Sequence, residues 1–310
     1  MNKQIVYLSI SAVVLLLIYI LMQSTSAPEA KHEQLVEVDT SLVTELVVTS
    51  EQGSVTLQRD DDNWMVVDPY EYRANKNFVE TLLEKLTDLR IEAEVTGKKD
   101  RHGEFEVTDE QAVYVKIDQG GDTSEILFGK SSRNRGQTYA RLPGKDKVYL
   151  IRGSYSVATR RPPDAWRDKK ITDFKQDEII AVDLPEIDLA KQGESWNALT
   201  PDGDEFTPDE AKVKRVTRAL ANLRTSDFPG EAAYQGINWS RPEHTFTLQL
   251  TDGGQRSIAI YPVPDEENRY FLRYSDSTGM KDTVFRIYSG VVNTLLWDET
   301  DLRPAAEDAS

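Results

Sequence analysis

The same order of residues occurs twice in this chain of 310 residues, and this repeat constrains the fold more than any other feature. Trp64 and Trp196 lie 132 positions apart, and four further pairs have the same separation: Val47 and Ile179, Val55 and Ile187, Leu57 and Leu189, Pro69 and Pro201. An apolar stripe follows at a separation of 134, from Val79 and Val213 to Leu89 and Leu223, and Trp166 and Trp297 lie 131 apart. The repeat predicts a tandem duplication of a unit of about 125 residues.

Each copy predicts a mostly antiparallel sheet and one helix. The alternating segment 43–48, the turn at Gly53 and the segment 55–57 predict a hairpin. Further strands are expected at 64–67, 112–117, 125–128, 138–141 and 147–151. Apolar residues at helical spacing over 78–89 predict a helix, and Thr207-Pro208-Asp209-Glu210 predicts a capping box at the second one. The expected fold class is α+β, with one long helix per unit and a single N-terminal transmembrane helix before the two units.

The segment from Ile5 to Met22 predicts that transmembrane helix. It has 18 residues without a charge, and a helix of this length spans about 27 Å, close to the ~30 Å core of a bilayer. A cleaved signal peptide has an apolar core of about 7–15 residues, so we expect a retained anchor. A cleaved signal and a buried core helix are the alternatives. Lys3 precedes the segment, which predicts a cytoplasmic N-terminus and an extracytoplasmic remainder.

The expected organisation has five parts. These are an anchor (1–22), a tether (23–42), two α+β units (43–175 and 176–303) and a C-terminal tail (304–310). The chain has 37 Lys and Arg residues against 53 Asp and Glu residues, and only one of these charges lies before residue 23. Such an acidic body repels nucleic acid, which we exclude as a partner. The chain has no cysteine, which excludes disulfides and thiolate chemistry.

No catalytic, cofactor or metal site is expected from the motifs. Gly129-Lys130-Ser131-Ser132 resembles the end of a phosphate-binding loop, but Ser124 stands where that motif needs glycine. The run from Asp202 to Glu205 lacks the spacing of a calcium loop and reads as a turn. The histidines, His32, His102 and His244, are not spaced as a metal pair, and there is no nucleophile elbow. The sequence therefore indicates a protein that is not an enzyme.

One basic cluster interrupts the acidic chain. Its members are Arg152, Arg160, Arg161, Arg167, Lys169 and Lys170. A basic patch on an acidic body can set the orientation of a partner, so the cluster is a candidate docking patch. The alternative is that these residues pair with acids at the junction of the two units.

Several segments together resemble the bacterial domain-of-unknown-function 4340 (DUF4340) family. They are Trp64, Pro69, Leu86 to Leu89, Gly129, Tyr139 to Arg141, Val148 to Ile151 and Trp166 to Lys169. The sequence departs from the family at Phe105-Glu106-Val107 and Tyr234-Gln235-Gly236-Ile237, where Tyr-Gly-Leu is common. The resemblance implies a membrane-tethered bacterial protein of unassigned activity, of a kind often encoded beside ABC-transporter components of the gliding-motility type. It carries over no catalytic residue.

The leading hypothesis is thus a non-enzymatic accessory or scaffold subunit of an ABC-transporter-type complex in the bacterial inner membrane. Its partners would be the lipid bilayer, through the N-terminal helix, and a membrane protein of that complex. The alternative is a periplasmic protein that binds a ligand or the cell wall, and a hydrolase of unrecognised type is the third hypothesis. Neither a cofactor nor a metal is expected.

Overall fold

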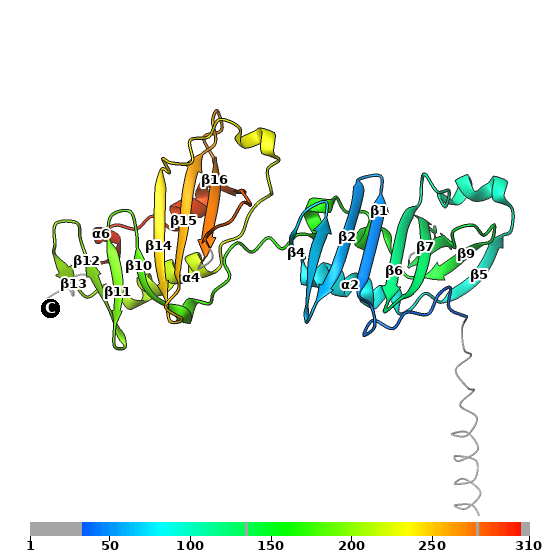
Figure 1. The fold of residues 1–310 in the computed structure, drawn as a ribbon, viewed down its shortest axis with the longest axis horizontal. Coiled ribbons are helices and arrows are strands. Elements are labelled where there is room, and N and C mark those ends of the chain that lie inside the picture. Colours follow the sequence, from blue (N-terminus) through cyan, green and yellow to red (C-terminus); the bar gives the residue numbers. More distant parts are fainter. Residues whose placement is uncertain (1–32, 134–135, 277–278, 305–310) are drawn as a thin grey trace, which may run out of the picture. The chain divides into compact units, whose positions relative to one another are not determined.

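The structure is a computed structural model that describes residues 33–133, 136–276 and 279–304. The chain divides into two compact units between Trp166 and Arg167 (Figure 1). The boundary predicted between residues 175 and 176 is too late, because Ile171 already donates a backbone hydrogen bond to Leu223 of the second unit. Each unit is described by itself below.

The first unit is built on one antiparallel sheet of nine strands, in the order β4-β3-β2-β1-β6-β7-β8-β9-β5. The strands are β1 (Glu45–Ser50), β2 (Gly53–Asp60), β3 (Asn63–Asp68), β4 (Tyr72–Arg73), β5 (Ile91–Thr96), β6 (Val113–Gln119), β7 (Asp122–Ser131), β8 (Gln137–Arg141) and β9 (Val148–Arg152). The helices are α2 (Lys76–Leu86), η1 (Lys99–Phe105), α3 (Ser156–Thr159) and η2 (Pro163–Trp166). The hairpin and the strands predicted from alternation are confirmed, whereas β4 and β5 were not predicted.

The core of this unit lies between the sheet and α2. Leu46 and Val48 of β1 stand opposite Leu57 and Val55 of β2, and all four side chains are buried. The helix begins after Asn75, whose side chain accepts from the backbone N–H of Phe78, and it buries four apolar side chains: Val79, Leu82, Leu83 and Leu86. Apolar residues at this spacing form one face of a helix, which therefore covers one face of the sheet.

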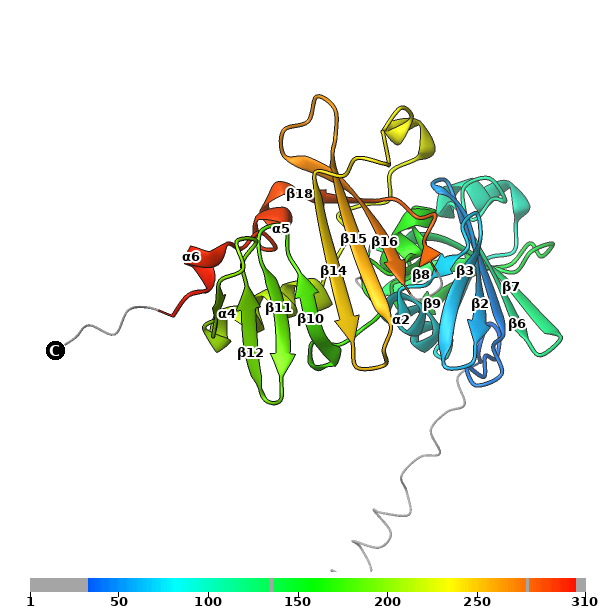
Figure 2. The ribbon, with the colours of Figure 1, turned by 60° about the vertical axis from the view of Figure 1, so that its left-hand side comes forward.

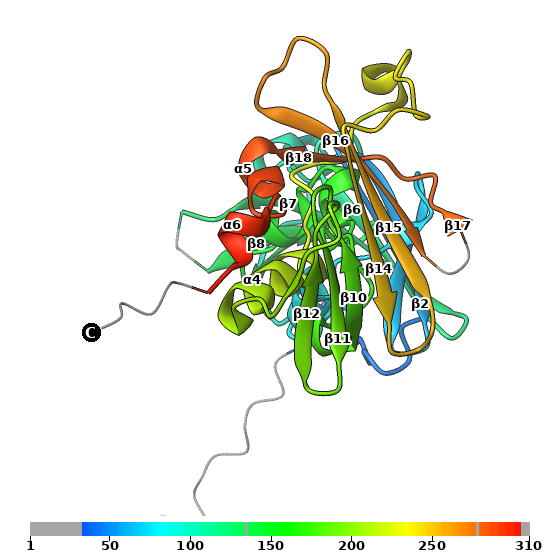
Figure 3. The same ribbon diagram turned by 90° about the vertical axis from the view of Figure 1, so that its left-hand side faces the viewer.

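The second unit has an antiparallel sheet in the order β13-β12-β11-β10-β14-β15-β16-β17, and β18 also pairs with β16. The strands are β10 (Ile179–Asp183), β11 (Asp188–Gln192), β12 (Ser195–Leu199), β13 (Glu205–Phe206), β14 (His244–Leu250), β15 (Gln255–Pro262), β16 (Arg269–Asp276), β17 (Gly279–Met280) and β18 (Phe285–Tyr288). The helices are η3 (Gln176–Glu178), α4 (Glu210–Ala221), η4 (Glu231–Tyr234), α5 (Ser289–Asn293) and α6 (Glu299–Leu302). Figure 2 shows β12, β11, β10, β14, β15 and β16 side by side, and Figure 3 shows α4, α5 and α6 on one face of this sheet.

The two sheets share a strand order. The run β3-β2-β1-β6-β7-β8-β9 of the first unit corresponds to β12-β11-β10-β14-β15-β16-β18 of the second. The segments that lead into the sheets also correspond, because Leu35 donates to the carbonyl of Leu89 just as Ile171 donates to that of Leu223. Below, two residues are called equivalent when they take the same place in these strand registers and backbone hydrogen bonds.

This definition corrects two of the pairs found in the sequence. Leu46 stands opposite Leu57, and Val182 stands opposite Leu189, so Val182 is equivalent to Leu46. The residue equivalent to Val47 is therefore Asp183 and not Ile179. The chain from Val182 to Leu189 is four residues shorter than the chain from Leu46 to Leu57, so the separation is 136 in β10 and 132 in β11.

The tryptophan pair at 166 and 297 is also wrong. The backbone N–H of Asn75 donates to the carbonyl of Trp166, and that of Asp209 donates to the carbonyl of Leu302. Trp166 is therefore equivalent to Leu302, and both are fully buried. Trp166 and Leu302 are 136 positions apart, and the same separation makes Trp297 equivalent to Arg161.

The predicted tether of residues 23–42 is too long. Gln34 forms a bridge with Arg90, Leu35 is buried, and Val36 and Val38 pack against the core of the first unit. These side chains are apolar and lie beside an apolar surface, so burial holds them against the unit. Residues 34–42 are part of the first unit, and residues 23–32 lie outside the described residues.

The predicted fold class is wrong. Both units consist mainly of antiparallel sheet with few short helices, and the longest helices described, α2 and α4, have 11 and 12 residues. The apolar stripe predicted a longer helix because Leu89 and Leu223 continue it, but both follow the C-cap of their helix. No helix within residues 33–304 is long and apolar enough to cross a membrane. The segment from Ile5 to Met22, on which the transmembrane helix was predicted, lies outside the described residues.

Candidate functional site

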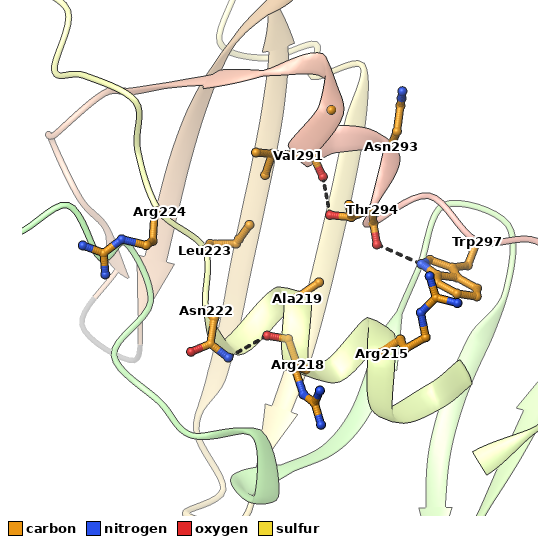
Figure 4. Close-up of a pocket in the computed structure, with 11 residues that line it drawn as sticks. Arg215, Arg218, Ala219, Asn222, Leu223, Arg224, Val291, Asn293, Thr294 and Trp297 are labelled. Atoms are coloured by element: carbon orange, nitrogen blue, oxygen red, sulfur yellow. Dashed lines mark hydrogen bonds between the residues drawn. The ribbon is translucent and has the colours of Figure 1, made fainter. Parts of the chain in front are cut away.

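The second unit contains a hollow of about 700 Å³ between α4 and the chain around α5 (Figure 4). Its lining residues are Arg215, Arg218, Ala219, Asn222, Leu223, Arg224, Gly290, Val291, Asn293, Thr294 and Trp297. This set is called the arginine hollow below. Its volume is within the range of about 300–1,000 Å³ found for ligand sites.

The helix α4 fixes one wall of the arginine hollow. Asp209 is its N-cap and accepts from the backbone N–H groups of Ala211 and Lys212, at 2.8 and 3.2 Å. The predicted capping box is therefore misplaced, since Thr207 is not the cap. The buried side chains Val213, Val216 and Leu220 fix the rotation of the helix, and residues between them in the sequence must then point outward.

The chain around α5 forms the other wall. Thr294 follows the helix, and its hydroxyl donates to the carbonyl of Val291 at 2.6 Å. The indole N–H of Trp297 in turn donates to the carbonyl of Thr294 at 2.8 Å. This bond orients the ring, and the guanidinium of Arg215 lies 5.4 Å from the ring centroid. A cation over an indole at this distance is attracted by the ring quadrupole.

A single side chain explains why the hollow is open. Val291 is equivalent to Tyr155 of the first unit, because Ala158 donates to the carbonyl of Tyr155 just as Thr294 donates to that of Val291. Tyr155 is fully buried, and its hydroxyl lies 3.0 Å from the carbonyl oxygen of Lys85 and 3.2 Å from that of Asp88. A tyrosine thus fills this place in the first unit, whereas the shorter valine leaves it empty in the second.

The lining carries positive charge only. Arg215, Arg218 and Arg224 are exposed at the rim, and the lining includes no Asp or Glu. None of the three guanidinium groups forms an ion pair with a carboxylate in the part of the chain that the structure describes. Ala219, Leu223 and Val291 supply an apolar floor. The chain as a whole has a net charge of −16, so this surface differs strongly from its surroundings.

This arrangement is suited to binding an anion that carries an apolar group. Arginine presents up to five donors in a planar fork that matches a carboxylate or phosphate, and the floor can take an apolar side chain. Asn222 already uses one amide donor on the carbonyl of Arg218 at 2.8 Å. The hollow offers hydrogen-bond donors and apolar surface, which are binding groups.

The structure distributes the basic cluster predicted from the sequence over both units. Arg152, Arg160 and Arg161 belong to the first unit and Arg167, Lys169 and Lys170 to the second.

In the first unit the three arginines have partners close by. Arg152 lies 4.0 Å from the carboxylate of Asp88, and Arg160 lies 3.5 Å from that of Glu106. The guanidinium of Arg161 stacks 3.8 Å from the ring centroid of Phe78, and burial lowers the pKa of Arg161.

In the second unit the cluster is also held by contacts within the unit. Arg167 is buried, with its guanidinium 3.7 Å from the ring centroid of Phe228. Lys169 donates to the carbonyl of Ser226 at 2.8 Å, and Lys170 bridges to Arg224 through the backbone.

Other residues singled out in the sequence have close packing, hydrogen-bond or ion-pair contacts. Gly129 lies in β7, and a side chain there would place Cβ 2.2 Å from the carbonyl oxygen of Phe105. His102 is buried, with Nε2 2.9 Å from the carbonyl oxygen of Asp146, and His244 lies 3.3 Å from Glu243. Within the described ranges no group of His, Asp and Glu side chains could hold a metal ion. His32 lies outside those ranges.

Sequence reasoning missed the arginine hollow. The signal was present in the comparison of the copies, because Arg215 and Arg218 stand where Thr81 and Glu84 stand in the first helix. A change from neutral or acidic to basic at two neighbouring surface positions marks a place where the charge of the two copies differs. The opening itself could not be inferred, since the pair Tyr155 and Val291 was not aligned.

A family model, Domain of unknown function (DUF4340), matches residues 64–238. No curated protein matches the chain. No solved structure matches it either.

Proposed function

This chain belongs to the DUF4340 family, and from that premise we propose that it is a non-enzymatic accessory subunit, which holds a partner protein of a membrane transport complex in the arginine hollow. The observation that carries the proposal is the hollow itself, with three rim arginines, an apolar floor and no acidic lining residue. Charge complementarity of this kind directs a partner to one orientation. The partner chemistry that fits is an acidic segment with an apolar side chain.

The proposal also includes a tether to the membrane. The uncharged segment from Ile5 to Met22 would hold the units at the extracytoplasmic face of the bacterial inner membrane. Two proteins confined to one membrane meet at a raised effective concentration. A contact between exposed charges, which is weak in free solution, would then be sufficient for assembly with an ABC-transporter component.

A test that preserves the charges is the substitution Val291→Tyr. It places in the second unit the side chain that fills the equivalent place in the first. A photo-crosslinking residue at Asn293, on the rim of the hollow, is expected to give a crosslink to a transporter component in native membranes. Val291→Tyr should abolish this crosslink.

The matched control is the same crosslinker at Val157, the exposed position equivalent to Asn293. It should give no such product. Equal crosslinking from both positions, or a product that survives Val291→Tyr together with Arg218→Glu, would contradict the proposal.

The hollow also favours a second candidate function, a periplasmic protein that binds a small anionic ligand. The observation is again the combination of apolar floor and rim arginines in a volume of ligand size. A co-purified small molecule that leaves the protein on Val291→Tyr, in the absence of any crosslinked protein, would select this candidate.

A further inference from the structure

A second hollow lies on the opposite flank of α4. It has a volume of about 430 Å³ and is lined by Gln176, Asp177, Ile179, Lys191, Trp196, Lys214, Thr217 and Arg218. We call it the Trp196 hollow. Arg218 lines both hollows, and in Figure 4 its guanidinium points away from the arginine hollow.

The Trp196 hollow combines an aromatic ring with basic side chains. Trp196 lies in β12 directly opposite Lys191 of β11, and it is only partly buried. Gln176 forms part of the wall, since its amide donates to the carbonyl of Lys214 and to the hydroxyl of Thr217 at 2.9 and 3.0 Å. Ile179 adds apolar surface. The hollow is thus a second place for an apolar side chain beside cationic groups.

The first unit has a hollow at the equivalent place, but its chemistry is different. It lies beside Trp64, which stands opposite Arg59 in the strand register as Trp196 stands opposite Lys191. The guanidinium of Arg59 lies 5.1 Å from the ring centroid of Trp64 and donates to the carbonyl of Thr40 at 2.7 Å. These contacts cover the ring, which is only 6% exposed.

The charges of the two equivalent hollows are opposite. Glu80 and Glu84 of α2 stand where Lys214 and Arg218 stand on α4. The lining of the Trp64 hollow has two basic and three acidic residues. The lining of the Trp196 hollow has three basic residues against Asp177 alone. The scaffold does not require the basic residues, since the first unit folds the same elements with acids there.

We propose that the two hollows flanking α4 form one continuous binding site, in which an acidic segment of the partner crosses the helix and places an apolar side chain in each hollow. This inference rests on the proposed function and extends it to the length and pattern of the partner segment. Crossing a helix of about 10 Å diameter requires about three extended residues. Arg218 lies at the centre of this path because it lines both hollows.

The geometry favours a peptide over a single anionic headgroup. Two separate apolar places with cations between them match an extended chain that carries apolar and acidic side chains in turn at every second residue, because those residues point to the same side. One headgroup would occupy only one hollow.

The test uses the full-length protein and a fluorescent twelve-residue peptide of three Leu-Ser-Glu-Ser repeats, which places Leu and Glu on one side of an extended chain. Binding is followed by anisotropy. Lys191→Glu changes the Trp196 hollow alone, Arg215→Glu changes the arginine hollow alone, and Arg218→Glu changes both. We expect each of the first two to weaken binding about tenfold and the third to weaken it more. Lys76→Glu makes the same charge change in the Trp64 hollow and should leave the affinity unchanged within about twofold.

A peptide with a single central Leu should bind more weakly and lose its sensitivity to Lys191→Glu. If Arg215→Glu weakens binding and Lys191→Glu does not, the continuous site is wrong while the proposed function stands. If the peptide does not bind, or if none of the three substitutions weakens it, both are wrong. Vesicles containing phosphatidylglycerol that bind with the same sensitivity to Lys191→Glu would reassign the Trp196 hollow to lipid and overturn the inference.

Discussion

The two units have the same strand order but differ in how equivalent positions are filled and exposed. In the first, Tyr155 fills the space beside α2, and Arg59 covers Trp64. In the second, Val291 leaves the equivalent space open, and Trp196 is only partly buried. The first unit therefore puts these positions into its core, whereas the second presents them on a basic surface. Under the proposed function the second unit would bind the partner, and the first serves as its internal control.

The largest expected effect comes from opening the first unit. Tyr155→Val removes a fully buried ring that stacks on Phe128 with centroids 4.5 Å apart, together with the hydrogen bonds of its hydroxyl. We expect a loss of about 3 kcal/mol in the free energy of unfolding of the first unit. Hydrogen exchange of β7 and α2 amides measures this unit separately from the other.

The reverse substitution supplies the control. Val291→Tyr in the second unit adds a ring where a hollow already exists, so its effect on unfolding should stay below about 1 kcal/mol. A similar loss in both units would contradict the contrast between a filled and an open site.

A second effect concerns the outer faces of the sheets. Gly129 of β7 lies directly beneath the carbonyl of Phe105, which leaves no room for a methyl group, while Tyr261 at the equivalent position of β15 packs against Trp239 with centroids 4.9 Å apart. Gly129→Ala should destabilise the first unit by about 1–3 kcal/mol, since the chain after η1 must move. Urea unfolding of the variant measures this, and an unchanged midpoint would show that the chain after η1 moves freely.

A third effect is a transfer of binding between the units. Glu80→Lys combined with Glu84→Arg places the basic pair of α4 on α2. In a chain that has lost the site on α4 through Arg218→Glu, the double variant should raise the affinity for the Leu-Ser-Glu-Ser peptide about tenfold. The exchange Glu80→Gln with Glu84→Gln controls for the loss of acid alone, and equal gains from both double variants would reject a role for the basic charges.

The sequence predicted the elements of each unit better than their relation. Strands with alternating apolar residues, and a helix with one apolar stripe, were found because burial imposes their period. The short strands β4, β5 and β13 were missed, since strands as short as β4 and β13 have too few residues to show a period and β5 keeps mainly polar side chains exposed. Equivalent positions were misassigned near turns, where Leu46 to Leu57 spans more residues than Val182 to Leu189.

The candidate site could not be predicted from the sequence, for a related reason. The basic cluster from Arg152 to Lys170 attracted attention because it is local in the chain, but stacking and ion pairs occupy much of it. The arginine hollow joins residues some 80 positions apart, from Arg215 to Trp297. Such a set becomes visible only when the fold places α4 beside α5, or when the two copies are aligned by strand register.

The smallest expected effect concerns a pair of like charges that lowers the stability of the second unit and has no counterpart in the first. Asp183 of β10 stands directly opposite Asp188 of β11, while the equivalent pair in the first unit is Val47 and Thr56. Burial, and then the charge of Asp188, raises the pKa of Asp183. The folded chain therefore holds this proton more tightly than the unfolded chain, so the ionised carboxylate lowers stability above its ordinary pKa of about 3.9. This cost disappears as the pH falls through the raised value.

Asp183→Asn removes the charge and should stabilise the second unit at pH 7 by about 0.2–1 kcal/mol, the usual size of a like-charge pair across two strands. The gain should vanish below about pH 4, because the wild-type carboxyl is then protonated as well. Hydrogen exchange of the β10 and β11 amides at the two pH values measures the effect in this unit alone. Val47→Asp in the first unit is the matched control, since it adds an aspartate at the equivalent position with Thr56 and Lys116 as its partners in the register. An equal gain from Asp183→Asn at both pH values would assign the effect to the amide and remove repulsion between the two aspartates as its cause.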